Sequence, residues 1–332
     1  MRLKDLRLVL LTTHFGNNFS GGSLASHEVL TRLQDHFGQV VVVGTQLGTH
    51  SIRNLKFLEY HHWLEAAGII RKLQREPCLF YGDFYNAVLL AWLRVDFVFT
   101  YHDNWPELGK LNGQHALHGL FYSAAYRRIF KRSTRLVTVS EFKQTALRRF
   151  HAAPVLIKNG FRKPAVRPAR TDSRVLMIGN IDARKYQLAL SVFDQLAPEE
   201  EIAIDIYGHV IDRRLAARLK QYPFVQLKGF QHPIPFEQYG LLLHTSFTES
   251  FGMVFCEAIS VGVPVLAFDA GGARELIHEG NGRLISAYDV SAMARTLVAM
   301  HKKPGHADPS SVDGLSWDKT AAQYLKLFRD VA

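Results

Sequence analysis

Short, wholly apolar runs alternate with longer segments whose apolar residues recur at helical spacing. In the first half of the chain, the runs that predict buried strands are Leu6–Leu11, Val40–Val43, Cys78–Tyr81, Phe97–Tyr101 and Leu136–Val139. The segments Ser23–Phe37 and Phe142–Phe150 lie between such runs and predict helices. Apolar strands that alternate with helices are typical of a parallel sheet covered on both faces.

The same alternation restarts in the second half. Its strand candidates are Arg174–Gly179, Ala203–Tyr207, Val225–Leu227, Leu241–Thr245 and Val265–Phe268. Between the halves, residues 163–173 carry two prolines and little apolar content, which predicts a linker. The closing residues 315–332 begin with a Ser N-cap candidate and have an apolar helical stripe. We therefore expect an α/β chain with domains at residues 1–162 and 174–314, and a ligand cleft between them.

Composition fits this organisation. A chain of 332 residues that is 47% hydrophobic suits two domains with real cores. Its two cysteines, Cys78 and Cys256, form no CxxC motif, and the sequence has no metal-like His/Cys cluster. No window approaches the roughly 20 apolar residues that span a bilayer. The basic start of residues 1–13 has too short an apolar run for a signal peptide. We expect a cytoplasmic protein.

Charge is distributed unevenly. Residues 1–158 have a net charge of +9 and residues 159–332 a net charge of +1, out of +10 in total. The basic residues that concentrate this excess are Arg127, Arg128, Lys131, Arg132, Arg135, Lys143, Arg148 and Arg149. Such a patch favours an anionic partner, which can be lipid head groups, an acidic saccharide or nucleic acid.

The segment His118–Arg132 joins this charge to apolar residues at helical spacing. Those residues are Leu120, Phe121, Ala124, Ala125 and Ile129. The pattern predicts a helix that lies on an anionic membrane surface. A helix that faces the core and has a solvated basic end is the alternative.

Two glutamates stand eight positions apart around a predicted strand-to-helix turn. The strand is Tyr239–Ser246, the helix is Gly252–Val261, and Glu249 and Glu257 flank the turn. A glycine at the helix start allows close approach of a ligand, and free amides there favour a phosphate. Glu257 would lie roughly 7 Å deeper along the helix, the offset of a ribose. Solvated helix glutamates often produce this spacing, but the turn and strand around it predict a nucleotide-sugar site.

The segment Thr248–Glu257 resembles the Glu-x7-Glu signature of retaining family 4 glycosyltransferases, which have the GT-B fold. The resemblance continues through Gly262–Ile277 and Gly280–Ile285, which match that family's downstream strand, Gly-Gly turn and hairpin-like exit. It implies two Rossmann-like domains that face a cleft. The first would bind the acceptor and the second the nucleotide sugar, and the C-terminal helix would cross back to the first domain.

Two segments of the first half add to the resemblance. Gly21 and Gly22 follow the first strand, and no GxGxxG is present, so a dinucleotide-binding dehydrogenase is not expected. The pair resembles the family's Gly-Gly loop under the donor phosphates, although an ordinary tight turn is the alternative. His102 follows a strand end and resembles the family histidine that contacts the donor sugar. Asp103 would orient the imidazole or cap the following loop.

The loop after the first strand of the second half carries two adjacent cations, Arg184 and Lys185. Two such residues can neutralise a leaving diphosphate. The family usually shows Gly-Arg-Leu-x3-Lys-Gly here. Lys185 matches its lysine, whereas Asn180 and Tyr186 stand where an arginine and a glycine are expected, so Arg184 would supply the missing guanidinium. The remaining residues that the resemblance places at the donor are Gly179, Gly208, Ser250, Phe251, Gly252 and Met253.

The resemblance implies sugar transfer with retention of configuration. His102, Glu249, Arg184 and Lys185 would be the catalytic residues, with Glu249 binding sugar hydroxyls rather than acting as a nucleophile. Glu257 would bind the ribose hydroxyls. The chain has no Asp-x-Asp, so we expect no metal and no cofactor beyond the nucleotide-sugar donor.

The expected acceptor is a saccharide or lipid-linked saccharide in bacterial cell-envelope polysaccharide or lipopolysaccharide synthesis, at the inner face of the cytoplasmic membrane. The sequence is equally compatible with different sugars, bases, linkages and oligomeric states. Two alternatives stay open. One is another GT-B activity, a nucleotide-sugar epimerase or a phosphorylase. The other is a basic nucleic-acid-binding protein, suggested by the sequence pI of about 9.6, although the sequence shows no recognised binding module.

Overall fold

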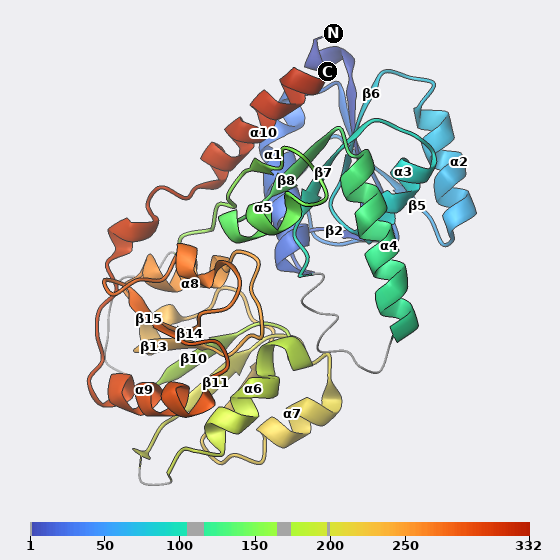
Figure 1. Cartoon of the computed structure of the whole chain (residues 1–332). Helices are drawn as coiled ribbons and strands as arrows, with labels where there is room; N and C mark the ends of the chain where they lie inside the picture. The colour runs from blue at the N-terminus through green and yellow to red at the C-terminus, as the bar shows by residue number, and fades with distance from the viewer. Residues whose placement is uncertain (1, 105–115, 165–173, 198–199) are drawn as a thin grey trace. The chain divides into compact units, whose positions relative to one another are not determined.

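The computed structural model describes residues 2–104, 116–164, 174–197 and 200–332. The chain forms two compact units, of which one is Met1–Gly160 with Leu315–Ala332 and the other is Phe161–Gly314 (Figure 1). Residues 165–173 of the expected linker lie outside the described residues. Each unit is an α/β domain with its own parallel sheet, which confirms the expected fold class.

Unit 1 contains a seven-stranded sheet in the order β5-β3-β1-β6-β7-β8-β9. Every neighbouring pair of these strands is parallel. The strands are β1 (Arg7–Leu11), β3 (Gln39–Gly44), β5 (Leu55–Glu59), β6 (Cys78–Gly82), β7 (Phe97–Tyr101), β8 (Arg135–Thr138) and β9 (Val155–Leu156). A separate two-stranded sheet pairs β2 (His14–Phe15) with β4 (Gln46–Leu47).

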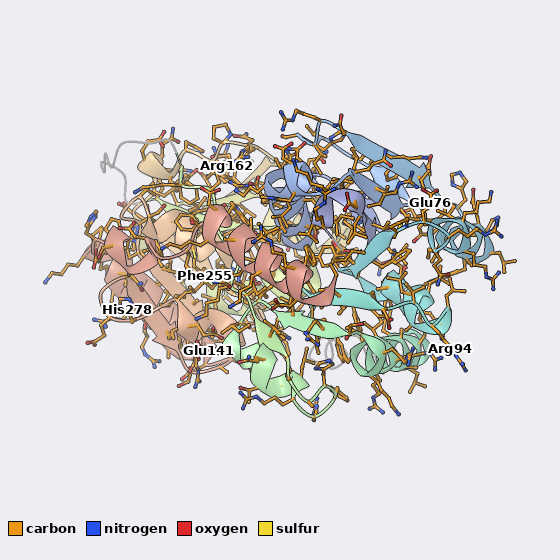
Figure 2. All side chains as sticks on the ribbon, turned by 90° about the horizontal axis from the view of Figure 1, so that it is seen from above. Glu76, Arg94, Glu141, Arg162, Phe255 and His278 are labelled. Atoms are coloured by element: carbon orange, nitrogen blue, oxygen red, sulfur yellow. The ribbon has the colours of Figure 1, made fainter. Side chains whose placement is uncertain are left out.

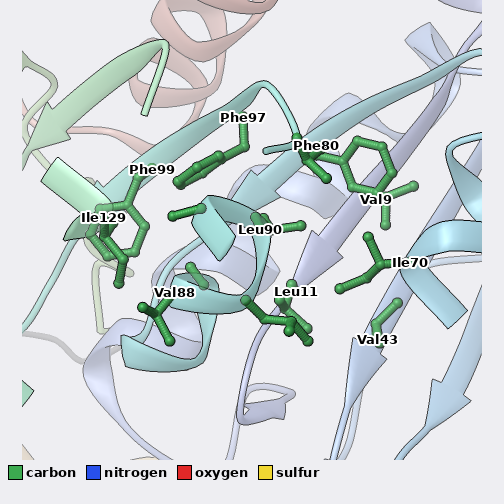
Figure 3. Packing of buried hydrophobic residues seen from close by; sticks show 14 of the residues in the cluster. Val9, Leu11, Val43, Ile70, Phe80, Val88, Leu90, Phe97, Phe99 and Ile129 are labelled. Carbon is green, nitrogen blue, oxygen red and sulfur yellow. The ribbon is translucent and has the colours of Figure 1, made fainter. Parts of the chain in front are cut away.

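Helices cover both faces of this sheet (Figure 1). They are α1 (Gly21–Leu33), α2 (Trp63–Leu73), α3 (Val88–Trp92), α4 (Ala116–Arg132), α5 (Glu141–Leu147) and α10 (Trp317–Val331), with 3-10 turns η1 (Leu3–Asp5), η2 (Gln34–His36) and η3 (Tyr85–Ala87). One core lies between the sheet and α2, α3 and α4, and Figure 3 shows part of its packing around Val9, Phe80 and Phe99.

The second core of unit 1 lies under α1 and the C-terminal helix α10. Tyr324 of α10 is buried, and its hydroxyl lies 2.8 Å from Oγ1 of Thr100 on β7. The rings of Phe328 and Tyr81 meet edge to face with centroids 5.8 Å apart. The C-terminal helix therefore belongs to the first unit, as the resemblance implied.

Unit 2 contains a six-stranded sheet in the order β12-β11-β10-β13-β14-β15, again parallel throughout. The strands are β10 (Val175–Ile178), β11 (Ile204–Tyr207), β12 (Val225–Gly229), β13 (Leu241–His244), β14 (Val265–Phe268) and β15 (Gly282–Ile285). The helices are α6 (Ala183–Phe193), α7 (Arg213–Leu219), α8 (Met253–Ile259) and α9 (Val290–Lys302), with η6 (Phe236–Gln238), η7 (Gly272–Glu275) and η8 (Pro309–Val312).

The expected hairpin-like exit over Gly280–Ile285 is wrong. β15 runs parallel to β14, with Val265 opposite Gly282 and Phe268 opposite Ile285. Parallel neighbours require a crossover connection rather than a tight turn. The intervening residues make that crossover through η7 and a turn in which Asn281 accepts a hydrogen bond from the amide of His278 at 2.9 Å.

Candidate functional site

The predicted cations and Glu249 meet at the carboxyl edge of the sheet in unit 2. β10 and β13 are neighbours, so the loops that follow them lie side by side. Thr245 donates its hydroxyl to the carbonyl of Lys185 at 2.8 Å, and the amide of Phe247 donates to the carbonyl of Arg184 at 2.8 Å. These bonds join the first turn of α6 to the loop that carries Glu249.

The carboxylate of Glu249 is enclosed by polar groups, and its side chain is 16% exposed. Oε2 lies 3.9 Å from Nη1 of Arg184 and 3.4 Å from Nε2 of His244. Oε1 accepts a hydrogen bond from the amide of Ser250 at 3.0 Å. The carboxylate thus keeps a small exposed surface through which a ligand hydroxyl can reach it.

The backbone of Glu249 is fixed by the turn after β14. Glu249 forms a parallel bridge with Gly271, and its carbonyl accepts from the amide of Gly272 at 2.8 Å. Gly271 has φ +71°, and a Cβ there would lie 2.1 Å from the carbonyl oxygen of Glu249. Only glycine allows this close approach.

Glu249 stays ionised despite its enclosure. Burial alone would raise the pKa of this carboxyl, but the contact with His244 and the charges of Lys185 and Arg184 outweigh burial and hold the pKa well below its usual range. An ionised carboxylate can only accept hydrogen bonds. Glu249 is therefore suited to bind hydroxyl groups and unsuited to donate a proton.

Lys185 supplies a cation that the protein leaves without a close partner. Its ammonium makes no hydrogen bond or ion pair with the residues that the structure describes. Burial lowers its pKa, and the charge of Glu249 opposes this effect. The side chain runs over Gly179, where a Cβ would lie 2.4 Å from Nζ. Gly179 therefore makes room for the lysine, and the ammonium remains available to an anion.

Arg184 both faces Glu249 and holds the loop. Its Nη1 donates to Oγ of Ser246 and to the carbonyl of Thr248, each at 3.3 Å. Its other guanidinium nitrogens donate no hydrogen bond within the described ranges. The guanidinium can therefore bind an anion while it supports the loop. Its substitution for the family arginine missing at Asn180 stays a prediction.

His244 is a site residue that the sequence reasoning missed. It ends β13, is 5% exposed, and its ring meets that of Phe255 edge to face at 4.8 Å (Phe255 is labelled in Figure 2). Burial lowers the pKa of its imidazole, and the contact with Glu249 opposes this only in part, so the ring is neutral. The one sequence feature that could have indicated His244 is that it is the polar residue at the end of the otherwise apolar run Leu241–His244.

Glu257 lies on α8, and its carboxylate makes no hydrogen bond with the described residues. Burial raises the pKa of this carboxyl to about 7, although the charge of Arg162 opposes the shift. The helix covers only Met253–Ile259, which is shorter than the expected Gly252–Val261. Gly252 caps it with φ +94°, and a Cβ there would lie 2.4 Å from the ring of Phe255.

The other predicted donor residues surround this group. Ser250 and Phe251 are buried in the loop before α8, and Met253, the first helical residue, is half-buried. Gly208, which follows β11, has φ +153°, and a Cβ there would lie 2.0 Å from the carbonyl oxygen of Gly179. The loops after β10 and β11 are therefore in backbone contact.

A flat aromatic pair stands next to these glycines. The rings of His209 and Phe230 are stacked, with centroids 4.3 Å apart and planes 9° apart. Phe230 is 51% exposed. Their loops are joined by a hydrogen bond from the amide of Gly208 to the carbonyl of Gly229 at 2.9 Å. An exposed stacked pair at a strand edge can support a planar ligand.

Unit 1 brings together His102 and the Gly21-Gly22 turn. The two glycines begin α1, and Ser20 caps this helix by accepting from the amide of Ser23. A Cβ on Gly22 would lie 3.1 Å from Cβ of His102. Burial lowers the pKa of His102 to about 4, and its Nε2 has no hydrogen-bond partner in the described part of the chain. A neutral, unpartnered imidazole remains for a ligand.

Asp103 does not orient His102. Its Oδ2 accepts from the hydroxyl of Tyr126 at 2.6 Å, and its Oδ1 accepts from the amide of Asn104 at 2.8 Å. The loop after Asn104 lies outside the described residues, so the capping role of Asp103 stays a prediction.

The apolar stripe predicted on α4 divides between two environments. Ala125 and Ile129 are in the core, 3% and 0% exposed. Leu120, Phe121 and Ala124 lie on the exposed side, where Leu120 is 67% exposed. The expectation that all five residues share a membrane-facing stripe is wrong, because the sheet of unit 1 covers one side of the helix.

The described residues include no group of three or more His, Cys, Asp or Glu side chains arranged to hold a metal ion. None of the helices that they form has both the length and the apolar character needed to cross a bilayer.

Two family models match the chain. Residues 25–162 match "Glycosyltransferase Family 4", and residues 172–303 match "Glycosyl transferases group 1". A D-inositol 3-phosphate glycosyltransferase from Streptomyces coelicolor is 34% identical over 124 residues, which is 33% of this chain and 26% of that protein. The chain thus spans about a quarter of the length of this relative.

Solved structures agree over nearly the whole chain. The Anabaena protein HepE, crystallised with UDP and glucose, has a TM-score of 0.79 at 17% identity, covering 98% of this chain and 100% of that one. WaaG, a glycosyltransferase involved in lipopolysaccharide biosynthesis, has a TM-score of 0.73 at 14% identity, covering 96% and 95%. These likenesses establish the GT-B fold. The two matched domains, over residues 25–162 and 172–303, relate the chain to glycosyltransferases of family 4 and group 1.

Proposed function

We propose that the protein transfers a sugar from a nucleotide diphospho-sugar to a hydroxyl acceptor with retention of anomeric configuration. The observation that carries the proposal is the grouping of an ionised Glu249, the partly free guanidinium of Arg184 and the unpartnered ammonium of Lys185 at one strand edge. A hydroxyl-binding carboxylate beside two cations is complementary to a sugar attached to a diphosphate.

Each part of the donor has a matching group. Glu249 accepts hydrogen bonds from sugar hydroxyls, and Lys185 and Arg184 bind the diphosphate oxygens. Glu257, whose carboxylate makes no hydrogen bond with the described residues, accepts from the ribose hydroxyls. The stacked rings of His209 and Phe230 support the base. The HepE structure, which contains UDP and glucose, supports a donor of this class.

The proposed reaction follows from these contacts. The bond between the anomeric carbon and the diphosphate oxygen breaks, and the electron pair leaves with the diphosphate. Arg184 and Lys185 stabilise the negative charge that develops there. The acceptor hydroxyl attacks from the same face and passes its proton to the leaving phosphate, which retains the configuration. Neutral His102 hydrogen-bonds to the donor sugar, and we expect no divalent metal to be required.

The acceptor is proposed to be a saccharide or a lipid-linked saccharide in cell-envelope polysaccharide or lipopolysaccharide synthesis. One similar structure supports this class through its title, since WaaG is a glycosyltransferase involved in lipopolysaccharide biosynthesis. We further propose that the enzyme works at the inner face of the cytoplasmic membrane.

The surface proposed to contact the membrane lies on α2, α3 and α4. Three of its side chains, Leu64, Leu120 and Trp92, are 83%, 67% and 48% exposed. A groove of about 620 Å³ beside Trp92 and Phe121 is also lined by Arg127, Arg128, Lys131 and Arg132. Apolar and tryptophan side chains next to cations suit the interface of an anionic bilayer.

The test is a transfer assay with purified protein and a panel of UDP-, GDP- and ADP-sugars. We expect one donor to release nucleoside diphosphate in step with glycosylation of an added saccharide acceptor. Glu249→Ala should abolish both products, whereas the control Glu279→Ala, at a glutamate whose side chain is 93% exposed, should not change them. Release without a glycosylated product would mean that the donor is hydrolysed rather than used for transfer, and undiminished transfer by Glu249→Ala would refute the site.

A further inference from the structure

Tyr288 adopts a backbone conformation that side chains rarely take. It lies between β15 and α9 with φ +67°, in the left-handed region. The turn around it is fixed, because the amide of Asp289 donates to the carbonyl of Ser286 and the amide of Val290 donates to that of Tyr288. Such a conformation is unfavourable for a residue other than glycine and persists where the surroundings impose it.

The side chain of Tyr288 is attached to the loop that carries Glu249. Its ring stacks on that of Phe247, with centroids 4.5 Å apart and planes 8° apart. Its hydroxyl donates to the carbonyl of Phe247 at 2.9 Å. Tyr288 therefore contacts both the side chain and the backbone of Phe247.

Phe247 is held on its other side by α6. Its amide donates to the carbonyl of Arg184 at 2.8 Å, and Nη1 of Arg184 donates to the carbonyl of the next residue, Thr248, at 3.3 Å. Both backbone polar groups of Phe247 are thus used, one toward α6 and one toward Tyr288. Glu249 follows only two residues later.

Because of the strand order in the sheet, Tyr288 connects segments that follow two strands that are not neighbours, β13 and β15. β15 is the edge strand, and β14 separates it from β13. The segment after β15 therefore reaches past β14 to the loop after β13. Tyr288 also lies near Phe268, the last residue of β14, with ring centroids 6.2 Å apart.

We propose that Tyr288 is a positioning residue that locks Phe247 and thereby presents Glu249 to the donor sugar. The inference rests on the proposed nucleotide-sugar function and adds a residue outside the donor contacts. Loss of the lock frees the loop at Phe247, so the contact with the sugar weakens while the contacts of Lys185 and Glu257 with the nucleoside diphosphate remain.

Two variants distinguish the loss of the contacts between Tyr288 and Phe247, which we call the lock, from a general loss of stability. Tyr288→Asn removes the ring and the hydroxyl, and asparagine tolerates the left-handed backbone. Tyr288→Phe keeps the stack and removes one hydrogen bond. The matched control is Tyr222→Phe, because the Tyr222 hydroxyl bonds to Asp194 and to the carbonyl of Leu190, away from this loop.

We expect Tyr288→Asn to bind the nucleotide sugar about tenfold more weakly and to lose at least that factor in kcat/KM. Its affinity for the nucleoside diphosphate alone should fall by a smaller factor, since the side chains of Lys185 and Glu257 do not contact Phe247. Tyr288→Phe should recover most of the loss. Equal nucleotide-sugar affinity in wild type and Tyr288→Asn would overturn the proposal.

Hydrogen exchange gives a readout that does not depend on the donor. Tyr288→Asn should speed exchange at the amides of Phe247 and Ser250, while Tyr222→Phe should not. If the wild type binds no nucleotide sugar, the proposed function fails, and exchange still decides whether the lock exists. Unchanged exchange at Phe247 in Tyr288→Asn would contradict the lock itself.

Discussion

Arg184 and Glu249 face each other across neighbouring loops, with Nη1 and Oε2 separated by 3.9 Å. This distance is too long for a strong hydrogen bond, and Nη1 is already engaged by the loop at Ser246 and Thr248. The pair therefore contributes charge to the site and leaves both side chains able to bind a ligand. Lys185, whose ammonium makes no hydrogen bond or ion pair with the described residues, adds to this positive charge.

Lys185→Met should weaken the binding of nucleoside diphosphate by about tenfold or more, because it removes a charged hydrogen bond to the diphosphate. The same variant should raise the melting temperature of the free protein, since it deletes a half-buried cation whose ammonium makes no hydrogen bond or ion pair with the described residues. Differential scanning fluorimetry with and without UDP or GDP measures both effects. Lower stability of the free variant, together with unchanged ligand binding, would contradict this role for the lysine.

Gly271→Ala should destabilise the protein by about 2 kcal/mol or more, because a side chain there both requires a disfavoured φ and meets the carbonyl of Glu249. The control is Gly229→Ala, at φ +72° with nothing within 4 Å of the added Cβ. Chemical denaturation gives the free energy of unfolding of both variants, and the difference between their losses is the effect of the clash with the carbonyl of Glu249. Equal losses would mean that φ alone is responsible.

The raised pKa of Glu257 should make the free energy of unfolding depend on pH. Burial raises the pKa of this carboxyl to about 7, so the folded state holds a proton that the unfolded state has released above about pH 4.5. The contribution of Glu257 to stability is therefore full below pH 4.5 and is lost as pH rises to about 7. Glu257→Gln should stabilise the protein more at pH 8 than at pH 5. An equal effect at the two pH values, measured by urea denaturation, would be inconsistent with the raised pKa.

The exposed surface on α2, α3 and α4 should bind anionic vesicles. Replacing Leu64 and Trp92 by glutamate should reduce cosedimentation with phosphatidylglycerol-containing vesicles by about tenfold, because it removes apolar contacts and adds repulsion. Neutral phosphatidylcholine vesicles should bind either protein weakly. Unchanged binding by the double variant would exclude this surface, and preferential binding to duplex DNA would revive the nucleic-acid alternative.

Much of the fold could be predicted, because the central strands are apolar on both faces. Val40–Val43 and Phe97–Tyr101 were found as strands, and both are fully buried. β5 was missed because it is an edge strand whose exposed positions include Lys56 and Glu59. The resemblance implies a hairpin-like exit at Gly280–Ile285, whereas β15 pairs in parallel with β14, a pairing that needs a crossover and that local sequence does not indicate.

The candidate site was predicted where a motif carried it. Glu249, Arg184 and Lys185 do come together in the structure. His244 and Tyr288 were missed because neither belongs to a motif. The contacts of these two residues depend on the order of the strands in the sheet and on the left-handed backbone of Tyr288. The spacing of apolar residues along the sequence reveals neither of these features. The role of Asp103 was uncertain for a related reason, because its partner Tyr126 lies on another element.

The central claim is that Glu249 holds the sugar and Glu257 the ribose of one donor. Isothermal titration of wild type, Glu249→Ala and Glu257→Ala with a nucleotide sugar and with its nucleoside diphosphate tests it most directly. We expect Glu249→Ala to lower the affinity for the nucleotide sugar alone. Glu257→Ala should lower the affinity for both ligands, and each loss should be about tenfold. Wild-type affinity of Glu249→Ala for the nucleotide sugar would contradict it.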